Sequence, residues 1–342
     1  MTNLLFSPSN SLCLRRKILL ILEPIFQIYI EIFSEASLTL TSGVSRYGFD
    51  HLGKLENLRK FCFWITDGVS EQQGNDKLLL LLETVPKLQS ANCLHNFPDE
   101  GRLMDITSAL NSCSKPLFLR DVSLFPELLV RPLSEIVPDT SQLDLINHYT
   151  LSTKCLGLKK VTELRFLGYF SQAALDSTVQ HYGRQLKVLK LTRETTDIEL
   201  NVVAENCPAL EWLECSSDCV PLPDKFDNPW PCLRRLVIFS GHFEHSDKIL
   251  QCAQNIQYLC CDFHILWLVL NSNARETGQF AFPNLVKAVF NSASVAAGEE
   301  LVEKFLFEAP KMQHLTLNDW PEQRIPWLSH VPGLRVVYFA LF

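Results

Sequence analysis

The sequence predicts an α/β solenoid, in which short strands and helices alternate and successive units stack into a parallel sheet. Three observations support this prediction: a short apolar template recurs along the chain, proline stands at a constant distance before it, and the segments between templates have helical periodicity. The 342 residues are 47% hydrophobic and 20% charged, which is enough apolar material for a large folded core. A repeat of this kind would make the chain one array rather than two domains.

The recurring template has apolar residues at its first, fourth and sixth positions, and is clearest in QLKVLKL (185–191), ALEWLEC (209–215) and CLRRLVI (232–238). From Val161 onward the first positions are separated by 25, 24, 23, 23, 29, 27 and 22 residues, which matches the unit length of leucine-rich repeats. The alternation within the template predicts a strand with one buried and one exposed row. Other templates begin at Leu58, Leu88, Leu119, Ile256, Leu285, Met312 and Leu334, and weaker matches begin at Ile25 and Leu143.

Proline stands two residues before the first template position in six units. Because proline lacks an N–H and disfavours a helical conformation in the residue before it, the chain leaves a helix there and continues extended. Residues 197–204 and 299–309, which lie between templates, carry apolar side chains at helical spacing. Each unit is therefore predicted to be a strand followed by a helix. The six prolines are Pro86, Pro208, Pro231, Pro283, Pro310 and Pro332.

We predict that residues 1–50 form an N-terminal cap or an atypical first repeat, and that residues 51–342 form the repeat array. An irregular region is expected at 125–160, because the template at Leu143 leaves uneven intervals of 24 and 18 residues. At the other end, the apolar segment VVYFALF (336–342) has no polar cap after it. We therefore expect either that the chain is a fragment of a longer repeat protein or that a partner covers this end.

The segment TDIELNVVAENCPALEWLECSSDC (196–219) resembles the cysteine-containing leucine-rich repeat of F-box proteins. The other units, from about residue 50 onward, resemble leucine-rich repeats only in general form. An N-terminal F-box module is not recognisable, since its Leu-Pro-x-Glu opening and later Val-Cys and Trp landmarks are missing. The residues that match the family motif are Thr196, Asp197, Leu200, Val203, Ala204, Cys207, Pro208, Leu210, Leu213 and Cys219.

The resemblance implies a leucine-rich-repeat horseshoe, with a parallel sheet on its concave face and helices on its convex face. It also implies that the chain is the substrate-binding component of an F-box-type (SCF) ubiquitin ligase, which selects proteins for degradation. Its partners would then be a target protein on the concave face, the ligase adaptor and the cullin. Within the matching unit, Thr196 and Asp197 are expected to cap a helix, and Cys207 and Cys215 to fill small buried spaces.

The exposed residues of successive strands line up across a stacked sheet, which makes this face a natural binding surface. Trp212, Arg235 and Tyr258 occupy the same template position in three successive units, so we expect them to be neighbours about 5 Å apart. Aromatic residues and arginine dominate protein interfaces. The alternative is that they are ordinary strand residues that shield the sheet. The residues predicted to bind a partner are Trp212, Arg235, Tyr258, Lys190, Glu214 and Arg165.

No catalytic, metal or cofactor site is predicted. His242 and His245 have a spacing that could suit a metal, but no second paired cluster accompanies them, which favours a solvated turn. Cys260, Cys261 and His264 could suggest a nucleophile with its base, yet strand alternation places the two cysteines on opposite faces. Glycine-rich phosphate loops and nucleophile elbows are also missing, so an enzyme remains only the alternative class.

Charge and cysteine usage indicate the setting of the chain. A net charge of -7 argues against nucleic acid or an anionic membrane as partner. Twelve dispersed cysteines without an Asn-x-Ser/Thr sequon indicate a reducing compartment, cytoplasmic or nuclear or both. The apolar run at 18–22 is too short for a membrane span. A scaffold without ligase association, and a secreted or membrane-tethered repeat receptor, remain the alternative functions.

Overall fold

A computed structural model of the chain divides into two compact units, and each is described by itself. Unit 1 comprises Met1–Ser123 and Leu129–Thr140, and unit 2 comprises Leu124–Leu128 and Ser141–Phe342. The structure describes residues 16–22, 26–32, 37–41, 60–65, 79, 82–83, 85, 87–95, 102–103, 106–148, 153–191, 198–216, 230–239, 249–250, 255–262, 264–265, 270, 282–291, 298–318, 328 and 331–339. The predicted boundary at residue 50 lies outside these residues.

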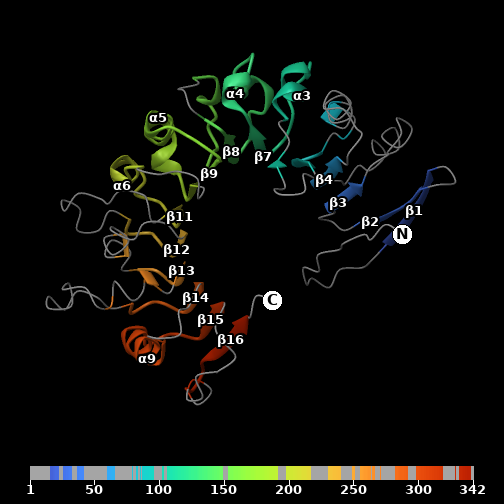
Figure 1. Cartoon of the computed structure of the whole chain (residues 1–342). Coiled ribbons are helices and arrows are strands. Elements are labelled where there is room, and N and C mark those ends of the chain that lie inside the picture. Colours follow the sequence, from blue (N-terminus) through green and yellow to red (C-terminus); the bar gives the residue numbers. More distant parts are fainter. Residues whose placement is uncertain are drawn as a thin grey trace. The chain divides into compact units, whose positions relative to one another are not determined.

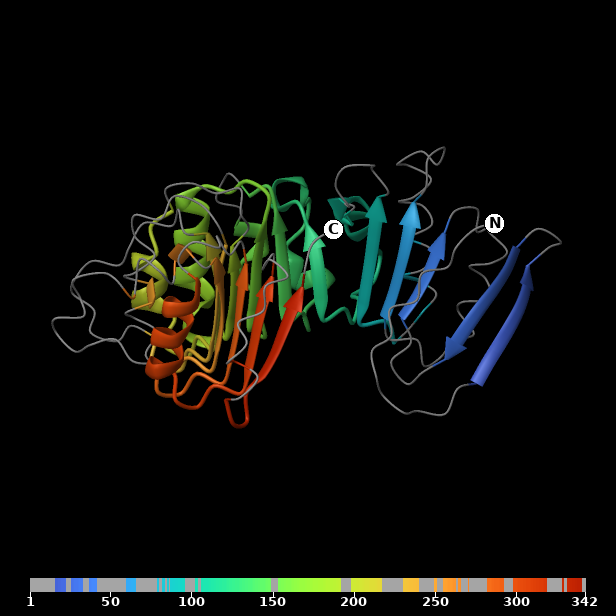
Figure 2. The ribbon, with the colours of Figure 1, turned by 60° about the horizontal axis from the view of Figure 1, so that its bottom comes forward.

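Unit 2 contains a parallel sheet in which strands that are consecutive in the sequence pair with each other (Figures 1 and 2). The α/β organisation and the parallel sheet predicted from the template are therefore confirmed. The strands are β8 (Gln142–Ile146), β9 (Glu163–Leu167), β10 (Val188–Leu191), β11 (Trp212–Ser216), β12 (Arg235–Phe239), β13 (Tyr258–Asp262), β14 (Lys287–Asn291), β15 (His314–Asn318) and β16 (Arg335–Phe339).

The template residues form the core of unit 2. Leu189, Leu213, Leu236 and Leu259 occupy the fourth template position, are register partners from β10 to β13, and are each 0% exposed. Burial of such a side chain stabilises the fold by about 1.5–3 kcal/mol, so the stacked leucines supply much of the driving force. Because one unit alone would leave this row exposed, adjacent strands stabilise one another.

The start of each strand repeats one hydrogen-bond arrangement. The amides of Glu211 and Trp212 both donate to the carbonyl oxygen of Lys187, at 2.8 and 2.9 Å. The amides of Arg234 and Arg235 donate in the same way to the backbone carbonyl oxygen of Glu211, at 2.8 and 3.0 Å. Paired donors of this kind also occur at the starts of β9, β10, β13, β14 and β15. This repetition keeps corresponding template positions side by side from one strand to the next.

The helices of unit 2 follow the strands. In Figure 1, α5 (Gln172–Tyr182), α6 (Asn201–Asn206) and α9 (Gly298–Glu308) lie on one side of the strands. Ser171 caps α5 by accepting a hydrogen bond from the amide of Ala174 at 3.2 Å. The helix predicted at 299–309 corresponds to α9. Among the described residues of the unit, 3-10 helices are also formed by η1 (Pro126–Leu128), η2 (Thr153–Cys155) and η3 (Gly183–Gln185).

The helix predicted at 197–204 begins later than expected. Its first residue is Asn201, and Leu200 precedes it without a side-chain capping bond. The side chain of Gln172 explains the delay, because its amide donates to the carbonyl of Glu199 at 3.0 Å and its oxygen accepts from the Glu199 amide at 2.8 Å. These two bonds hold Glu199 outside the helix. The predicted caps Thr196 and Asp197 lie outside the described residues.

Unit 1 has a smaller parallel arrangement. Strand β4 pairs with β3 and β5, β5 also pairs with β7, and β6 lies antiparallel to β5. A separate antiparallel pair is formed by β1 and β2, and β2 contains Ile28 and Ile30 of the weak template match, while Ile25 lies outside the described residues. The elements are β1 (Arg16–Leu22), β2 (Phe26–Ile32), β3 (Ser37–Thr41), β4 (Lys60–Ile65), β5 (Ser90–His95), β6 (Arg102–Leu103), α3 (Thr107–Ser112), β7 (Asp121–Leu124) and α4 (Leu133–Ile136).

The template that was predicted to begin at Leu143 begins three residues earlier in the structure. Leu143 pairs with Leu164, which is a fourth-position residue, so the first position three residues earlier is Thr140. Thr140 is 0% exposed, and its hydroxyl donates to the carbonyl of Leu119, 21 residues earlier, at 3.1 Å. A satisfied polar side chain thus occupies an apolar position. With Thr140 as first position, the intervals from Leu119 and to Val161 are both 21 residues (140−119 and 161−140).

The last strand shifts by one residue. The amide of Leu334 donates to the carbonyl of Val331, as first-position residues do in other units, so the turn follows the predicted template. Strand β16, however, pairs His314 with Arg335 rather than with the expected Val336. At the start of β16 the amide of Arg335 alone donates to the carbonyl oxygen of Gln313. At the starts of β9 to β15, two consecutive amides donate to one carbonyl oxygen of the preceding strand's unit.

None of the helices within the described residues has the length and apolar character that crossing a membrane requires.

Candidate partner-binding face

The side chains predicted to bind a partner lie on the face of the unit 2 sheet opposite the buried leucines. Val188, Trp212, Arg235, Tyr258 and Lys287 are successive register partners from β10 to β14. Strand alternation separates them from the buried residues that follow each of them. Trp212, Arg235 and Tyr258 are partly exposed, and Lys287 is exposed. The predicted adjacency of Trp212, Arg235 and Tyr258 is confirmed, while their role in binding stays a prediction.

Cations and aromatic rings alternate along this line. The guanidinium carbon of Arg235 lies 3.8 Å from the ring centroid of Trp212 and 4.3 Å from that of Tyr258. On one side, Lys190 Nζ lies 3.7 Å from the Trp212 ring centroid, and on the other, Lys287 Nζ lies 5.5 Å from the Tyr258 ring centroid. We call these five residues the cation–aromatic row. Such contacts contribute about 0.5–1 kcal/mol each at exposed sites and more where water is excluded.

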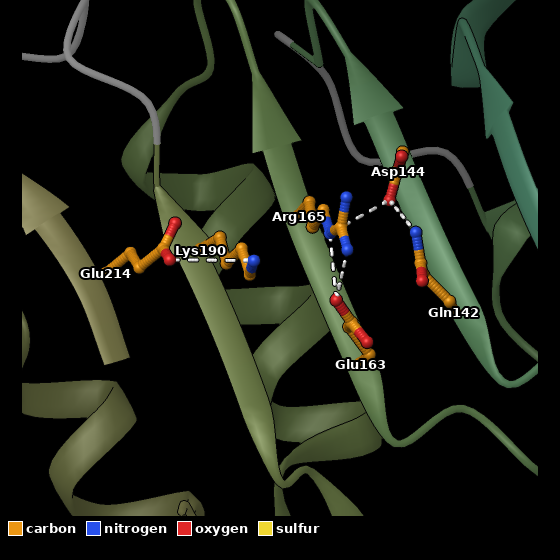
Figure 3. A network of polar contacts seen from close by, with 6 residues as sticks. All are labelled: Gln142, Asp144, Glu163, Arg165, Lys190 and Glu214. Atoms are coloured by element: carbon orange, nitrogen blue, oxygen red, sulfur yellow. Dashed lines mark hydrogen bonds and ion pairs between the residues drawn. The ribbon is translucent and has the colours of Figure 1, made fainter. Parts of the chain in front are cut away.

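A network of charges continues the face across β8 to β11 (Figure 3). Arg165 Nη2 lies 2.6 Å from Glu163 Oε1, and Arg165 Nε lies 3.7 Å from Asp144 Oδ1. Lys190 Nζ lies 3.5 Å from Glu214 Oε1, with both side chains less than one-fifth exposed. Each of these cations therefore has a carboxylate beside it. Arg165, Lys190 and Glu214 from the predicted set are occupied by contacts within the protein.

The pKa shifts on this face come from partial burial and neighbouring charge. Burial lowers the pKa of Lys190, and the charge of Glu214 opposes this shift without cancelling it. Burial raises the pKa of Tyr258, while Arg235 acts in the opposite direction. Burial also lowers the pKa of Arg165, but its hydrogen bond to Glu163 and the nearby carboxylates outweigh that effect and leave the pKa raised. Around neutral pH, Lys190 and Arg165 are cations and Tyr258 is a neutral phenol.

Amide side chains line the far ends of the strands on the same face. Asn318 Nδ2 donates to Asn291 Oδ1 at 2.6 Å, and Asn291 Nδ2 approaches Cys260 Sγ at 4.0 Å. This short chain of polar contacts links β13, β14 and β15. It lies beside the cation–aromatic row, next to Asp262, which is the register partner of Asn291.

Sequence reasoning placed Trp212, Arg235 and Tyr258 but did not assign Lys287, Asp144 or Glu163 to the site. Lys287 shares the template position of Tyr258 and could have been found by continuing that position to the next unit. Asp144 could not be placed, because the template in its unit was read from Leu143 instead of Thr140. Glu163 shares the template position of Trp212, but it contacts Arg165, which lies two residues later on the same strand, and the template predicts neighbours only between strands.

The other candidate sites behave differently. Burial raises the pKa of Cys260, and the pKa of Cys261 is raised well above its ordinary value, so both thiols stay protonated near neutral pH. Cys261 is buried and Cys260 is partly exposed, as alternation predicts. His242 and His245 lie outside the described residues. Within the described part of the chain, no three His, Cys, Asp or Glu side chains are grouped as metal ligands would be.

Comparison with known proteins gives a likeness of fold. No family model matches the sequence, and no curated protein matches it. The structure is similar to a chain of the crystal structure of the Rad7 and Elc1 complex in yeast, with a TM-score of 0.50 and 14% sequence identity. The matched region covers 89% of this chain and 80% of that chain. At this identity the likeness concerns the fold alone.

Proposed function

We propose that this protein is a recognition module whose stacked units form a leucine-rich-repeat solenoid, with the sheet as the concave face and the helices on the convex face. The observation that carries the proposal is the cation–aromatic row. Trp212, Arg235 and Tyr258 are held together at 3.8 and 4.3 Å on a face that no helix of the described residues covers in Figure 1. Rigid aromatic and arginine side chains are the residue types that contribute most to protein interfaces.

The proposed setting is an F-box-type ubiquitin ligase, in which the chain selects a target protein for degradation. The cysteine-containing repeat at 196–219 supports this setting, since Cys207 and Cys215 are both fully buried as that repeat implies. The fold likeness to a chain of a complex of two proteins is compatible with it. An adaptor and a cullin would be the further partners. The chemistry of ubiquitin transfer would take place on other subunits.

A cytoplasmic or nuclear location belongs to the same proposal. Seven cysteines are free thiols: Cys113, Cys155, Cys207, Cys215, Cys232, Cys260 and Cys261. Free thiols are typical of a reducing compartment. They favour the ligase component, or a scaffold without ligase association, over a secreted receptor.

The test is affinity capture from cells, with the wild type and the double variant Trp212→Ala/Arg235→Ala compared by quantitative mass spectrometry. We expect cullin and adaptor subunits to be captured by both, and the target protein by the wild type alone. The matched control is Lys159→Ala/Arg184→Ala, which removes two exposed cations outside the sheet. Circular dichroism melting confirms that each variant is folded.

The outcomes separate the two parts of this proposal. If cullin subunits never co-purify, the ligase setting fails while the recognition module stands. If the double variant retains every protein that the wild type captures, the face is not the binding surface.

A further inference from the structure

The two ends of the face differ in how their charges are neutralised. Arg165 and Lys190 both have a carboxylate within 4.0 Å. Arg235 and Lys287, on β12 and β14, form no ion pair with any carboxylate of the described residues. Tyr258 lies between them in register. The row therefore ends in two cations that are separated by an aromatic ring and have no internal counter-charge in that part of the chain.

Apart from the Tyr258 hydroxyl, which can donate and accept, the polar groups of the row are donors. Trp212 Nε1 and Arg235 Nε are buried atoms with no hydrogen-bond acceptor among the residues that the structure describes. Lys287 is exposed and adds an ammonium group. The two buried atoms are out of reach of a partner, so the exposed ammonium group of Lys287 and the outer part of the Arg235 guanidinium are the donors that a ligand meets. A partner that supplies acceptors is therefore preferred to one that supplies further donors. A carboxylate offers two acceptor oxygens and a negative charge together.

Carboxylates on the same face lie too far away or are already engaged. Glu214 is paired with Lys190. Asp262 is at the opposite end of β13, four residues from Tyr258, which corresponds to roughly 13 Å along a strand. This distance exceeds the screening length of about 8 Å at physiological salt. Glu214 also acts electrostatically on Tyr258, but its charge is paired with Lys190. Arg235 and Lys287 are therefore the cations beside Tyr258 that have no ion pair among the described residues, although the chain as a whole carries a net charge of -7.

We propose that this end of the row binds an acidic segment of a partner protein, with an aspartate or glutamate carboxylate between Arg235 and Lys287 and the adjoining chain packed on Tyr258. This assignment rests on the proposed recognition function and specifies the chemistry of its target. Nucleic acid is the less suitable polyanion, because two cations neutralise few phosphates and the acidic remainder of the protein repels the others.

The test measures binding of a synthetic probe to the full chain by fluorescence anisotropy in 150 mM NaCl, where the screening length is about 8 Å. The probe is a fluorescein-labelled 12-residue peptide with four glutamates in a Gly-Ser background, and its control peptide has glutamine in place of glutamate. Lys287→Glu reverses an exposed charge and should leave the fold intact. We expect this variant to raise the Kd of the glutamate peptide by about fivefold or more, as loss and reversal of one ion pair implies. The control variant Lys159→Glu should change that Kd by less than about twofold.

Four results would overturn the assignment. The first is equal binding of the glutamate and glutamine peptides, and the second is an unchanged Kd for Lys287→Glu. The third is tighter binding of a 12-nucleotide thymidine oligonucleotide than of the glutamate peptide, which would indicate a nucleic-acid ligand. If neither peptide binds while capture from cells still requires Trp212 and Arg235, the acidic-segment assignment fails and the recognition module stands.

Discussion

At the scale of single residues, the guanidinium group of Arg235 is held between two aromatic rings, at 3.8 Å from Trp212 and 4.3 Å from Tyr258. A planar guanidinium stacks on both rings, whereas the ammonium of lysine is a compact and strongly hydrated charge. The arrangement therefore depends on the shape of the side chain as well as on its charge. It also keeps both rings in fixed positions before a partner arrives, which lowers the entropy lost on binding.

Arg235→Lys should lower the free energy of unfolding by about 1–2 kcal/mol, because both ring contacts are weakened while the charge is kept. Urea denaturation followed by circular dichroism measures this change. Arg234→Lys is the matched control, since Arg234 is exposed and makes a 3.4 Å hydrogen bond to the carbonyl of Asn255. Its effect should stay within about 0.5 kcal/mol. Equal losses in the two variants would show that the stacking of Arg235 contributes nothing.

The thiol of Cys207 makes stability depend on pH. Burial raises its pKa from 9.0 to about 12, so the folded protein keeps the proton where the unfolded chain loses it. The stabilisation is complete below pH 9 and is lost as pH rises toward 12. We expect the free energy of unfolding to fall by at most about 1.4 kcal/mol per pH unit in this window.

Cys207→Ala tests this assignment, because alanine packs in the same space and has no proton to lose. The variant should flatten the decline in stability between pH 9 and 10.5, measured by urea denaturation. Cys232→Ala is the control, since that cysteine is exposed. An unchanged slope in the Cys207 variant would assign the pH dependence to other groups.

At the scale of elements, the approach of η3 to α6 depends on one glycine. A Cβ atom at Gly183 would lie 2.6 Å from the carbonyl oxygen of Asn206, the last residue of α6. Gly183→Ala should therefore force the two elements apart and lower the free energy of unfolding by about 1–3 kcal/mol. Gln185→Ala, at an exposed position of the same turn, should change stability by less than about 0.5 kcal/mol. Thermal and urea unfolding give both values, and a neutral Gly183 variant would contradict this close contact.

The strands were predictable because the apolar residues of the template are the residues that the fold buries. Leu189, Leu213 and Leu236 recur at spacings that only stacked parallel strands bury together. Thr140 was missed, because a buried threonine breaks an apolar pattern, and its hydrogen bond to Leu119 is visible only in three dimensions. The start of α6 was missed for a similar reason, since the bonds from Gln172 to Glu199 connect residues 27 positions apart.

For the molecule as a whole, the sequence predicted which face of the sheet carries Trp212, Arg235 and Tyr258, but not how the charges around them are distributed. Register placed the three side chains side by side. The pairing of Arg165 with Glu163 and Asp144 depends on side-chain conformations that the template does not encode. The distinction between the neutralised end of the face and its cationic end therefore required the structure. That distinction is what turns a general binding surface into one with a preference for acidic segments.

Site-specific photo-crosslinking in cells tests most directly whether this face binds the partner. The photoreactive amino acid p-benzoylphenylalanine is placed either at Val188, which is the register partner of Trp212 on the exposed face, or at Glu303, which is exposed on α9. We predict that the variant at position 188 forms a covalent adduct with the captured target and that the variant at position 303 does not. An adduct formed from position 303, with none from position 188, would contradict the assignment of the binding surface.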